Sequence, residues 1–321
     1  MRSRAPHLRA IPVAPAPATQ QTRVGLTGRL ASALLRGAGP ALGLASLVVL
    51  TAGCPGKGSQ NPGAQSTERQ SDSEYDLARD LFEKGNPRAA LDHATKAITL
   101  NDDNDKAHYF VAVIHLSFCS TNRGLEAVDC KLSEAEKHAR AALKANADFR
   151  DAKNLLGQIL VNQKRCKEAI PVLEPLTKDP AYVHPYFAWG NLGEAQLCEG
   201  QIDAAIASLK NAVAEPRFCV GHYRLGLAYE KKGDFAAAEA SLGNAVGADP
   251  QCEGLQDAWW ARCRIRKHLG NAEWKKDCEK CRDIGAAPPS TSDTKTGKLC
   301  VQMLTESGRG AEATTTTTRT P

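Results

Sequence analysis

Three stretches of the chain repeat one template: Lys153-x-x-Leu156-Gly157-x-x-Leu160, Trp189-x-x-Leu192-Gly193-x-x-Gln196 and His222-x-x-Leu225-Gly226-x-x-Tyr229. Each glycine is followed twelve residues later by an alanine, and these alanines are Ala169, Ala205 and Ala238. Apolar and small residues three and four apart mark one face of a helix, and small residues let two helices approach closely. Because turn residues such as Gly200-Gln201 and Gly233-Asp234 separate the two halves, the pattern predicts an array of helical hairpins.

The template extends in both directions. Ala78 and Ala90 are twelve residues apart with Gly85-Asn86 between them, which makes residues 71–104 a first repeat. In the second repeat, Ala112 and Ala135 are 23 apart, so an insertion lengthens the loop between the helices at 119–130. A degenerate sixth unit runs from Trp259 through a Gly270-Asn271 turn to Asp283, and its basic decoration is typical of a polar capping repeat.

The spacing and the template resemble the tetratricopeptide repeat, a helix–turn–helix unit of about 34 residues. The resemblance covers residues 71–283 and implies an all-α solenoid of about six repeats. His108 and His222 occupy the tryptophan position of the template, so both are interpreted as packing residues. Residues 284–321 are rich in Ala, Pro, Ser, Thr and Gly, and we expect them to be a low-complexity, disordered tail.

The front of the chain predicts export. Residues 1–53 carry six arginines and no acid, and the apolar run 41–52 is too short to span a bilayer but suits a signal peptide. The run ends Leu50-Thr-Ala-Gly-Cys54, which resembles the bacterial lipoprotein signal and implies that Cys54 is lipidated. Translation could start near Val24 rather than at Met1. The alternative to lipidation is ordinary secretory cleavage nearby, which would leave Cys54 as a free thiol.

A polar segment at 54–70 is expected to be a flexible tether behind the lipid. Pro55, in place of Asp, favours retention at the outer membrane, facing the periplasm. Without residues 1–53 the chain holds 35 basic and 36 acidic side chains, so it has no basic footprint for nucleic acid.

Ten cysteines follow Cys54, and an even number in an exported chain favours disulfides. Sequence alone does not choose among the possible pairings, but the repeat geometry narrows them. It favours Cys119–Cys130 at the neck of the inserted loop, Cys166–Cys198 and Cys219–Cys252 at matching ends of helices, and Cys263–Cys278 across the last hairpin. Cys281–Cys300 is the pair that remains, and it would tie back the tail. A redox dithiol or half a zinc site at Cys278-Glu-Lys-Cys281 is the alternative, but the βαβ context and a second ligand pair are missing.

No motif for a catalytic nucleophile, a nucleotide or a metal is present, so neither enzymatic activity nor a cofactor is predicted. In the tetratricopeptide family, positions 2, 5, 9, 12 and 13 of each first helix line a groove that holds a partner segment. The resemblance therefore assigns a mainly apolar groove, suited to an apolar partner segment, to Tyr75, Arg79, Phe82, Tyr109, Val113, Leu116, Asn154, Gln158, Val161, Phe187, Glu194, Leu197, Tyr223, Leu227 and Glu230. Packing between repeats is the alternative role for each of these side chains.

A lipid-anchored repeat array of this kind resembles the pilotin lipoproteins of type IV pilus systems, in particular the Tgl social-motility type related to PilF and PilW. The resemblance implies a non-enzymatic scaffold that binds secretin subunits and helps them assemble in the outer membrane. The alternative is a general envelope adaptor for outer-membrane protein assembly or peptidoglycan enzymes. A third possibility is a periplasmic thiol enzyme built on Cys278 and Cys281.

Overall fold

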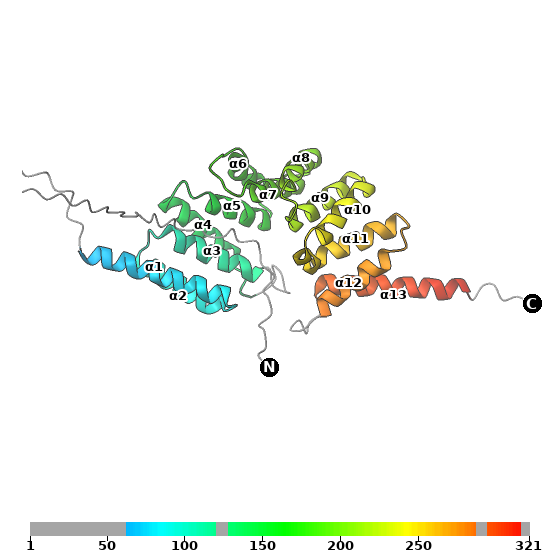
Figure 1. The fold of residues 1–321 in the computed structure, drawn as a ribbon, viewed down its shortest axis with the longest axis horizontal. Helices are drawn as coiled ribbons and strands as arrows, with labels where there is room; N and C mark the ends of the chain where they lie inside the picture. Colours follow the sequence, from blue (N-terminus) through cyan, green and yellow to red (C-terminus); the bar gives the residue numbers. More distant parts are fainter. Residues whose placement is uncertain (1–61, 120–127, 287–293, 316–321) are drawn as a thin grey trace, which may run out of the picture. The chain divides into compact units, whose positions relative to one another are not determined.

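The computed structural model describes residues 62–119, 128–286 and 294–315, and every regular element in these ranges is a helix. The predicted signal peptide, Cys54 and most of the predicted inserted loop lie outside the described residues. Thirteen α-helices follow one another along the described chain (Figure 1). They are α1 Pro62–Glu83, α2 Pro87–Leu100, α3 Asp105–Cys119, α4 Leu132–Ala145, α5 Arg150–Asn162, α6 Cys166–Thr177, α7 Pro185–Cys198, α8 Ile202–Ala212, α9 Cys219–Lys232, α10 Phe235–Gly247, α11 Gln256–His268, α12 Trp274–Ala286 and α13 Lys295–Thr315, with a short 3-10 turn at Pro250–Gly254.

Helices α1 to α12 form six consecutive hairpins, which confirms the predicted repeats. Each hairpin contributes a first helix (the odd-numbered ones) and a second helix. The first helices also contact one another directly, α3 with α5, α5 with α7, α7 with α9 and α9 with α11. The first helices therefore form a continuous layer, and side chains from different repeats meet on it.

The template glycines and alanines allow the close packing within each hairpin. A Cβ atom on Gly157 would lie 2.4 Å from the Leu173 side chain, and one on Gly193 would lie 2.5 Å from Leu209. Ala169, twelve residues after Gly157, is fully buried. Four of the inter-helix turns use a glycine with positive φ, whereas the third repeat uses Lys164 at φ 63°.

The predicted tether is wrong from residue 62 onward, because α1 begins at Pro62. Proline is well suited to the first turn of a helix, and the Ala, Gln, Glu and Arg residues that follow are good helix formers despite their polarity. Ser71 ties the helix to the array: its hydroxyl donates to the Ala97 carbonyl at 2.8 Å and accepts from Asn104 Nδ2 at 2.8 Å. Asn104 in turn caps α3 by accepting from the Ala107 amide.

The predicted disordered tail is also wrong in part, because residues 295–315 form α13. Thr294 caps this helix by accepting from the Gly297 amide at 2.9 Å, and its hydroxyl donates to Gln256 Oε1 at 2.7 Å. The helix packs against α11 and α12, and Cys300 is bonded to Cys281 on α12. The sixth repeat is consequently not the end of the array, since α13 covers part of it.

The ten cysteines form five disulfides whose pairing agrees with the one predicted from the repeat geometry, and their Cα–Cα distances run from 4.5 to 6.2 Å. Cys278 and Cys281 are bonded to different partners rather than to each other, and both side chains are fully buried. None of the described helices is both long enough and apolar enough to cross a membrane.

Candidate partner-binding surface

The structure divides the fifteen predicted groove residues into two groups. Five are buried in the core and pack helices together, so their assignment to a groove is corrected: Tyr75, Val113, Leu116, Val161 and Phe187. The other ten are half-buried, and none of the fifteen is fully exposed. These side chains are buried because consecutive first helices contact each other, so part of the predicted groove face packs against the neighbouring repeat.

Aromatic rings pack between the first helices of the first repeats. Tyr75 and Phe82 of α1 both meet Phe110 of α3 edge-on, with ring centroids 5.9 and 5.5 Å apart. Tyr109 of α3 lies against Phe149, which precedes α5, at 4.9 Å between centroids. Burial raises the pKa of the Tyr109 hydroxyl well above its usual value, so this side chain stays neutral at any physiological pH.

A polar chain crosses the middle of the layer, from α5 to α7 to α9. Asn191 Nδ2 on α7 donates to Asn154 Oδ1 on α5 at 2.9 Å, and Arg224 Nη1 on α9 donates to Asn191 Oδ1 at 3.0 Å. Arg224 also forms an ion pair with Glu194 on α7, and its side chain is only 12% exposed. Four polar side chains from three repeats are thereby held in one fixed arrangement.

A second charged link joins α9 to α11. Arg264 forms a bidentate pair with Glu230, with its two terminal nitrogens 2.7 and 3.1 Å from the carboxylate oxygens. The same guanidinium group lies over the Trp260 ring, 5.6 Å from its centroid. Tyr223 on α9 is close enough to Arg264 and Glu194 for their charges to influence its pKa, which burial raises strongly.

Sequence reasoning missed Asn191, Arg224 and Arg264. Asn191 and Arg224 occupy equivalent positions, two residues after the first residue of the motifs Trp189-x-x-Leu192 and His222-x-x-Leu225. A polar residue at that position in two successive repeats is the signal that could have identified them. Arg264 had no comparable signal, because arginine occurs at every second position from 262 to 266.

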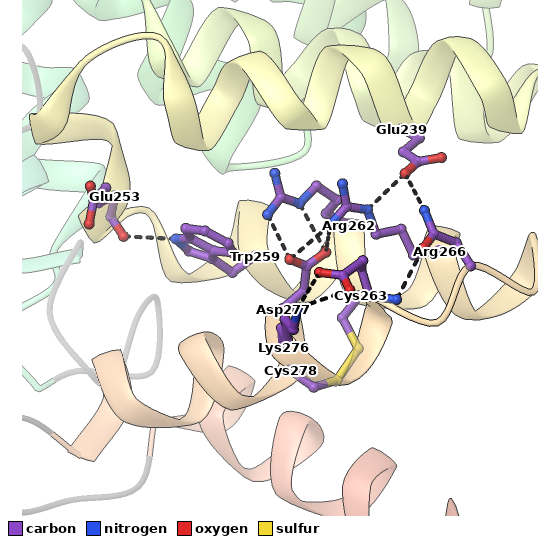
Figure 2. Close-up of polar contacts among 11 residues, drawn as sticks. Glu239, Glu253, Trp259, Arg262, Cys263, Arg266, Lys276, Asp277 and Cys278 are labelled. Carbon is purple, nitrogen blue, oxygen red and sulfur yellow. Dashed lines mark hydrogen bonds and ion pairs between the residues drawn. A yellow bond between two sulfur atoms is a disulfide. The ribbon is translucent and has the colours of Figure 1, made fainter.

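The last hairpin contains a buried charge cluster of a different kind. Figure 2 shows Asp277 of α12 between Arg262 and Arg266 of α11, and the shortest of these contacts is 2.6 Å. The Asp277 side chain is 2% exposed, and Arg266 continues to Glu239 on α10 at 2.7 Å. The Cys263–Cys278 disulfide lies beside this cluster. Because every charge here is paired and turned inward, the cluster serves to hold α10, α11 and α12 together.

Metal-binding geometry is found at a single place in the described chain, where Cys166, Cys198 and Glu199 lie close together. The two sulfur atoms are already bonded to each other, so they are not available as thiolate ligands.

Comparison with known proteins supports the repeat assignment. Tetratricopeptide-repeat family models match residues 75–118, 131–183 and 221–252. No curated protein matches the sequence closely enough to be counted a relative.

Several solved structures share the fold. PilW, described as a widely conserved type IV pilus biogenesis factor, is 22% identical with a TM-score of 0.56, over 72% of this chain and 98% of PilW. PilF of Pseudomonas aeruginosa is 18% identical with a TM-score of 0.53, over 75% of this chain and 99% of PilF. Human IFIT1, solved with a capped RNA fragment, is 15% identical with a TM-score of 0.55, over 74% and 59% of the two chains.

The TM-scores for PilW and for the RNA-bound IFIT1 are nearly the same, 0.56 and 0.55. The similarity therefore shows the fold and does not identify the partner. From the hairpins, the template matches and these structures, we conclude that the body of this chain is an all-α solenoid of tetratricopeptide repeats, linked by disulfides.

Proposed function

We propose that the chain is a protein-binding scaffold of the bacterial cell envelope that acts as a pilotin, promoting secretin assembly for type IV pili. The observation that carries the proposal is the continuous layer of first helices, on which half-buried aromatic, amide and charged side chains from five repeats meet. A surface of this kind suits an extended or helical segment of another protein, because anchors of several types lie at regular intervals along it.

Two further observations support a location in the cell envelope and a role in type IV pilus assembly. PilW and PilF match this chain over almost their whole length, so the similarity is not confined to one shared repeat. Five disulfides in one array favour an oxidising compartment such as the periplasm. In the proposal Cys54 carries the lipid and holds the array at the outer membrane, facing the periplasm.

The partner is tested by capture from detergent-solubilised envelopes with the full-length, oxidised protein. The test variant combines Arg79→Glu and Gln158→Glu, two half-buried positions of the first-helix layer. The control variant combines Lys167→Glu and Asn211→Glu, which change the net charge by the same amount on the exposed faces of the second helices α6 and α8. We avoid Tyr109 and Tyr223 because an acidic group at these packed positions would destabilise the repeats.

We expect the unmodified protein and the control variant to recover a secretin. The test variant should recover at least about tenfold less secretin, which corresponds to a loss of about 1.4 kcal/mol of binding free energy. Capture of wall hydrolases or outer-membrane assembly factors without secretin would overturn the pilotin proposal in favour of the general envelope adaptor. Equal loss in both variants would place the binding surface elsewhere.

The anchor is tested separately. Cys54→Ser should move the protein from the membrane fraction to the soluble periplasmic fraction and remove lipid labelling, while the array keeps its disulfides and its thermal stability. Retention of the variant in the outer membrane would show that Cys54 is not the anchor.

A further inference from the structure

Three histidines meet in the second repeat, where α3 faces α4. His108 and His115 lie seven residues apart on α3, and His138 lies opposite them on α4. The Nδ1 atoms of His108 and His138 are 2.9 Å apart, and the ring of His115 stacks beside that of His138 with 6.5 Å between centroids. His108 and His115 are both 8% exposed, and His138 is half-buried, so the contacts lie largely inside the hairpin.

Hydrogen bonding determines which nitrogen atoms carry protons. His108 Nε2 is 3.0 Å from the carbonyl oxygen of Asp102, and a carbonyl oxygen can only accept a hydrogen bond. His108 Nε2 therefore carries the proton of the neutral ring, and its Nδ1 has a free lone pair. The short contact between the two Nδ1 atoms then requires that His138 Nδ1 is the donor.

This arrangement leaves little room for added protons. One added proton can be accommodated across the 2.9 Å contact, but a second would set two N–H groups against each other, which is repulsive, so the closed pair holds fewer protons than two separated rings. His115 Nδ1 is buried and has no hydrogen-bond partner among the described residues, so a charge on that ring would be uncompensated. Burial above all, together with the nearby His108, Lys137 and His115, lowers the pKa of His138 to about 4; burial also lowers the pKa of His115.

Few of the surrounding charged groups would stabilise a protonated His138 or His115. Lys137 disfavours a positive His138 and Lys131 disfavours a positive His115, whereas Glu134 on α4 is the acid that favours both. Glu136, also on α4, is already bound by Arg140 and by Arg165 from the turn before α6. On the α1–α2 side, Glu74 is bound by His93 and Lys96.

We propose that the His108–His138 contact is a proton-sensitive latch that holds α3 against α4 near neutral pH and releases the second repeat in acid. The ordinary pKa of a histidine is about 6.5, and the pKa values in the closed hairpin are lower, so the open hairpin takes up protons first. The closed state is therefore fully favoured above about pH 6.5 and loses stability as the pH falls from there toward 4. The Cys119–Cys130 bond still joins α3 to α4 at the loop end, so opening is confined to the other end, where His108 and Tyr109 begin α3.

The experiment is amide hydrogen exchange of the full-length, oxidised protein between pH 7 and pH 5, corrected for the pH dependence of intrinsic exchange. We expect protection of α3 and α4 to fall at least about tenfold, the amount that corresponds to one unit of pKa difference. Protection of α3 and α4 that is unchanged between the two pH values would overturn the proposal.

Two matched variants identify the histidine responsible. His138→Gln keeps an N–H donor for His108 but cannot gain a proton, so the loss of protection of α3 and α4 in acid should become smaller, with His115 still contributing. His222→Gln removes a buried histidine at the position in α9 equivalent to His108, and it should leave the response of α3 and α4 unchanged. An identical acid response in the wild type and the His138→Gln variant would also overturn the proposal.

A measurement on the unmodified protein covers the case in which His138→Gln does not fold. Ring nitrogen NMR at pH 7 should show His138 protonated on Nδ1 and His108 protonated on Nε2. The opposite tautomers would contradict the latch, because the donor and acceptor would then be exchanged.

Discussion

The first repeats and the last hairpin are stabilised by different means. From α1 to α7 a single apolar cluster runs from Tyr75 to Ala195 and contains large side chains such as Ile114, Ile159 and Leu173. Around α10 and α11 the corresponding cluster is small, with Ala238, Leu242, Ala261 and Ile265 at its centre. There the buried Asp277 cluster and two disulfides supply the cohesion. The comparison teaches that a repeat can keep its geometry with little apolar core if covalent and ionic links replace it.

The largest expected effect tests the ionic part of that comparison. Asp277→Ala leaves Arg262, only 12% exposed, without its carboxylate, and breaking a buried pair in this way costs about 3–5 kcal/mol. Three of the four tryptophans lie in α11 and α12, so tryptophan fluorescence during denaturant unfolding follows this region. We expect the last hairpin to unfold first. Asp203→Ala is the control, because Asp203 is 86% exposed and its pair with Lys232 contributes about 0–1 kcal/mol.

The next largest effect tests the apolar part. Leu173→Ala removes a fully buried side chain that packs against Gly157, and we expect a loss of about 2–5 kcal/mol. Circular dichroism should register this loss as earlier unfolding of the first repeats, with the tryptophan signal of the last hairpin changing less. A uniform shift of both signals would contradict a division into two differently stabilised regions.

The disulfides test whether covalent links matter more where the core is small. Replacing Cys263 and Cys278 by Ala opens a link with a sequence separation of 15, which corresponds to about 3 kcal/mol. Replacing Cys119 and Cys130, with a separation of 11, should cost a similar amount of stability, because the disulfide restricts the unfolded chain to a similar degree. In hydrogen exchange we expect α11 and α12 to lose protection throughout in the first variant, whereas α3 keeps most of its protection in the second because of its apolar neighbours.

The smallest effect concerns the end of the array. Thr294→Ala removes the cap of α13 and the hydrogen bond to Gln256, and we expect a cost of about 1 kcal/mol. Hydrogen exchange of residues 295–306 should increase while α11 and α12 are unchanged. Thr305→Ala is the control, because that hydroxyl donates only to the Gln302 carbonyl on the exposed side of the same helix.

Prediction from sequence was most successful where a rule of spacing applies. The register of the hairpins follows from Gly157, Gly193 and Gly226 and their alanine partners, because only small residues fit where the helices of a pair touch. The cysteine pairing followed from the same register, since it determines which helix ends are neighbours. Composition was a poorer guide: residues 62–70 and 295–315 are polar, yet they are helical because Ser71, Thr294 and Cys300 join them to the array.

The candidate surface was predicted less well. The template placed fifteen side chains on the first helices, but which of them are buried depends on how closely the neighbouring repeat approaches, and five proved to be core. Asn154, Asn191 and Arg224 belong to three different repeats, and no spacing within one repeat could show that they contact each other. The His108–His138 contact lies within one repeat, but the inserted loop separates the two residues in the sequence by more than the usual spacing, which hid it.

The sequence by itself determined the repeat unit and its turns and narrowed the disulfide pairing, because these depend on local periodicity and on small residues at helix contacts. Tertiary structure alone decided which groove positions are open, which charges are paired and which histidines share a proton. Those properties depend on distances of a few ångströms between side chains from different helices, and periodicity does not specify such distances.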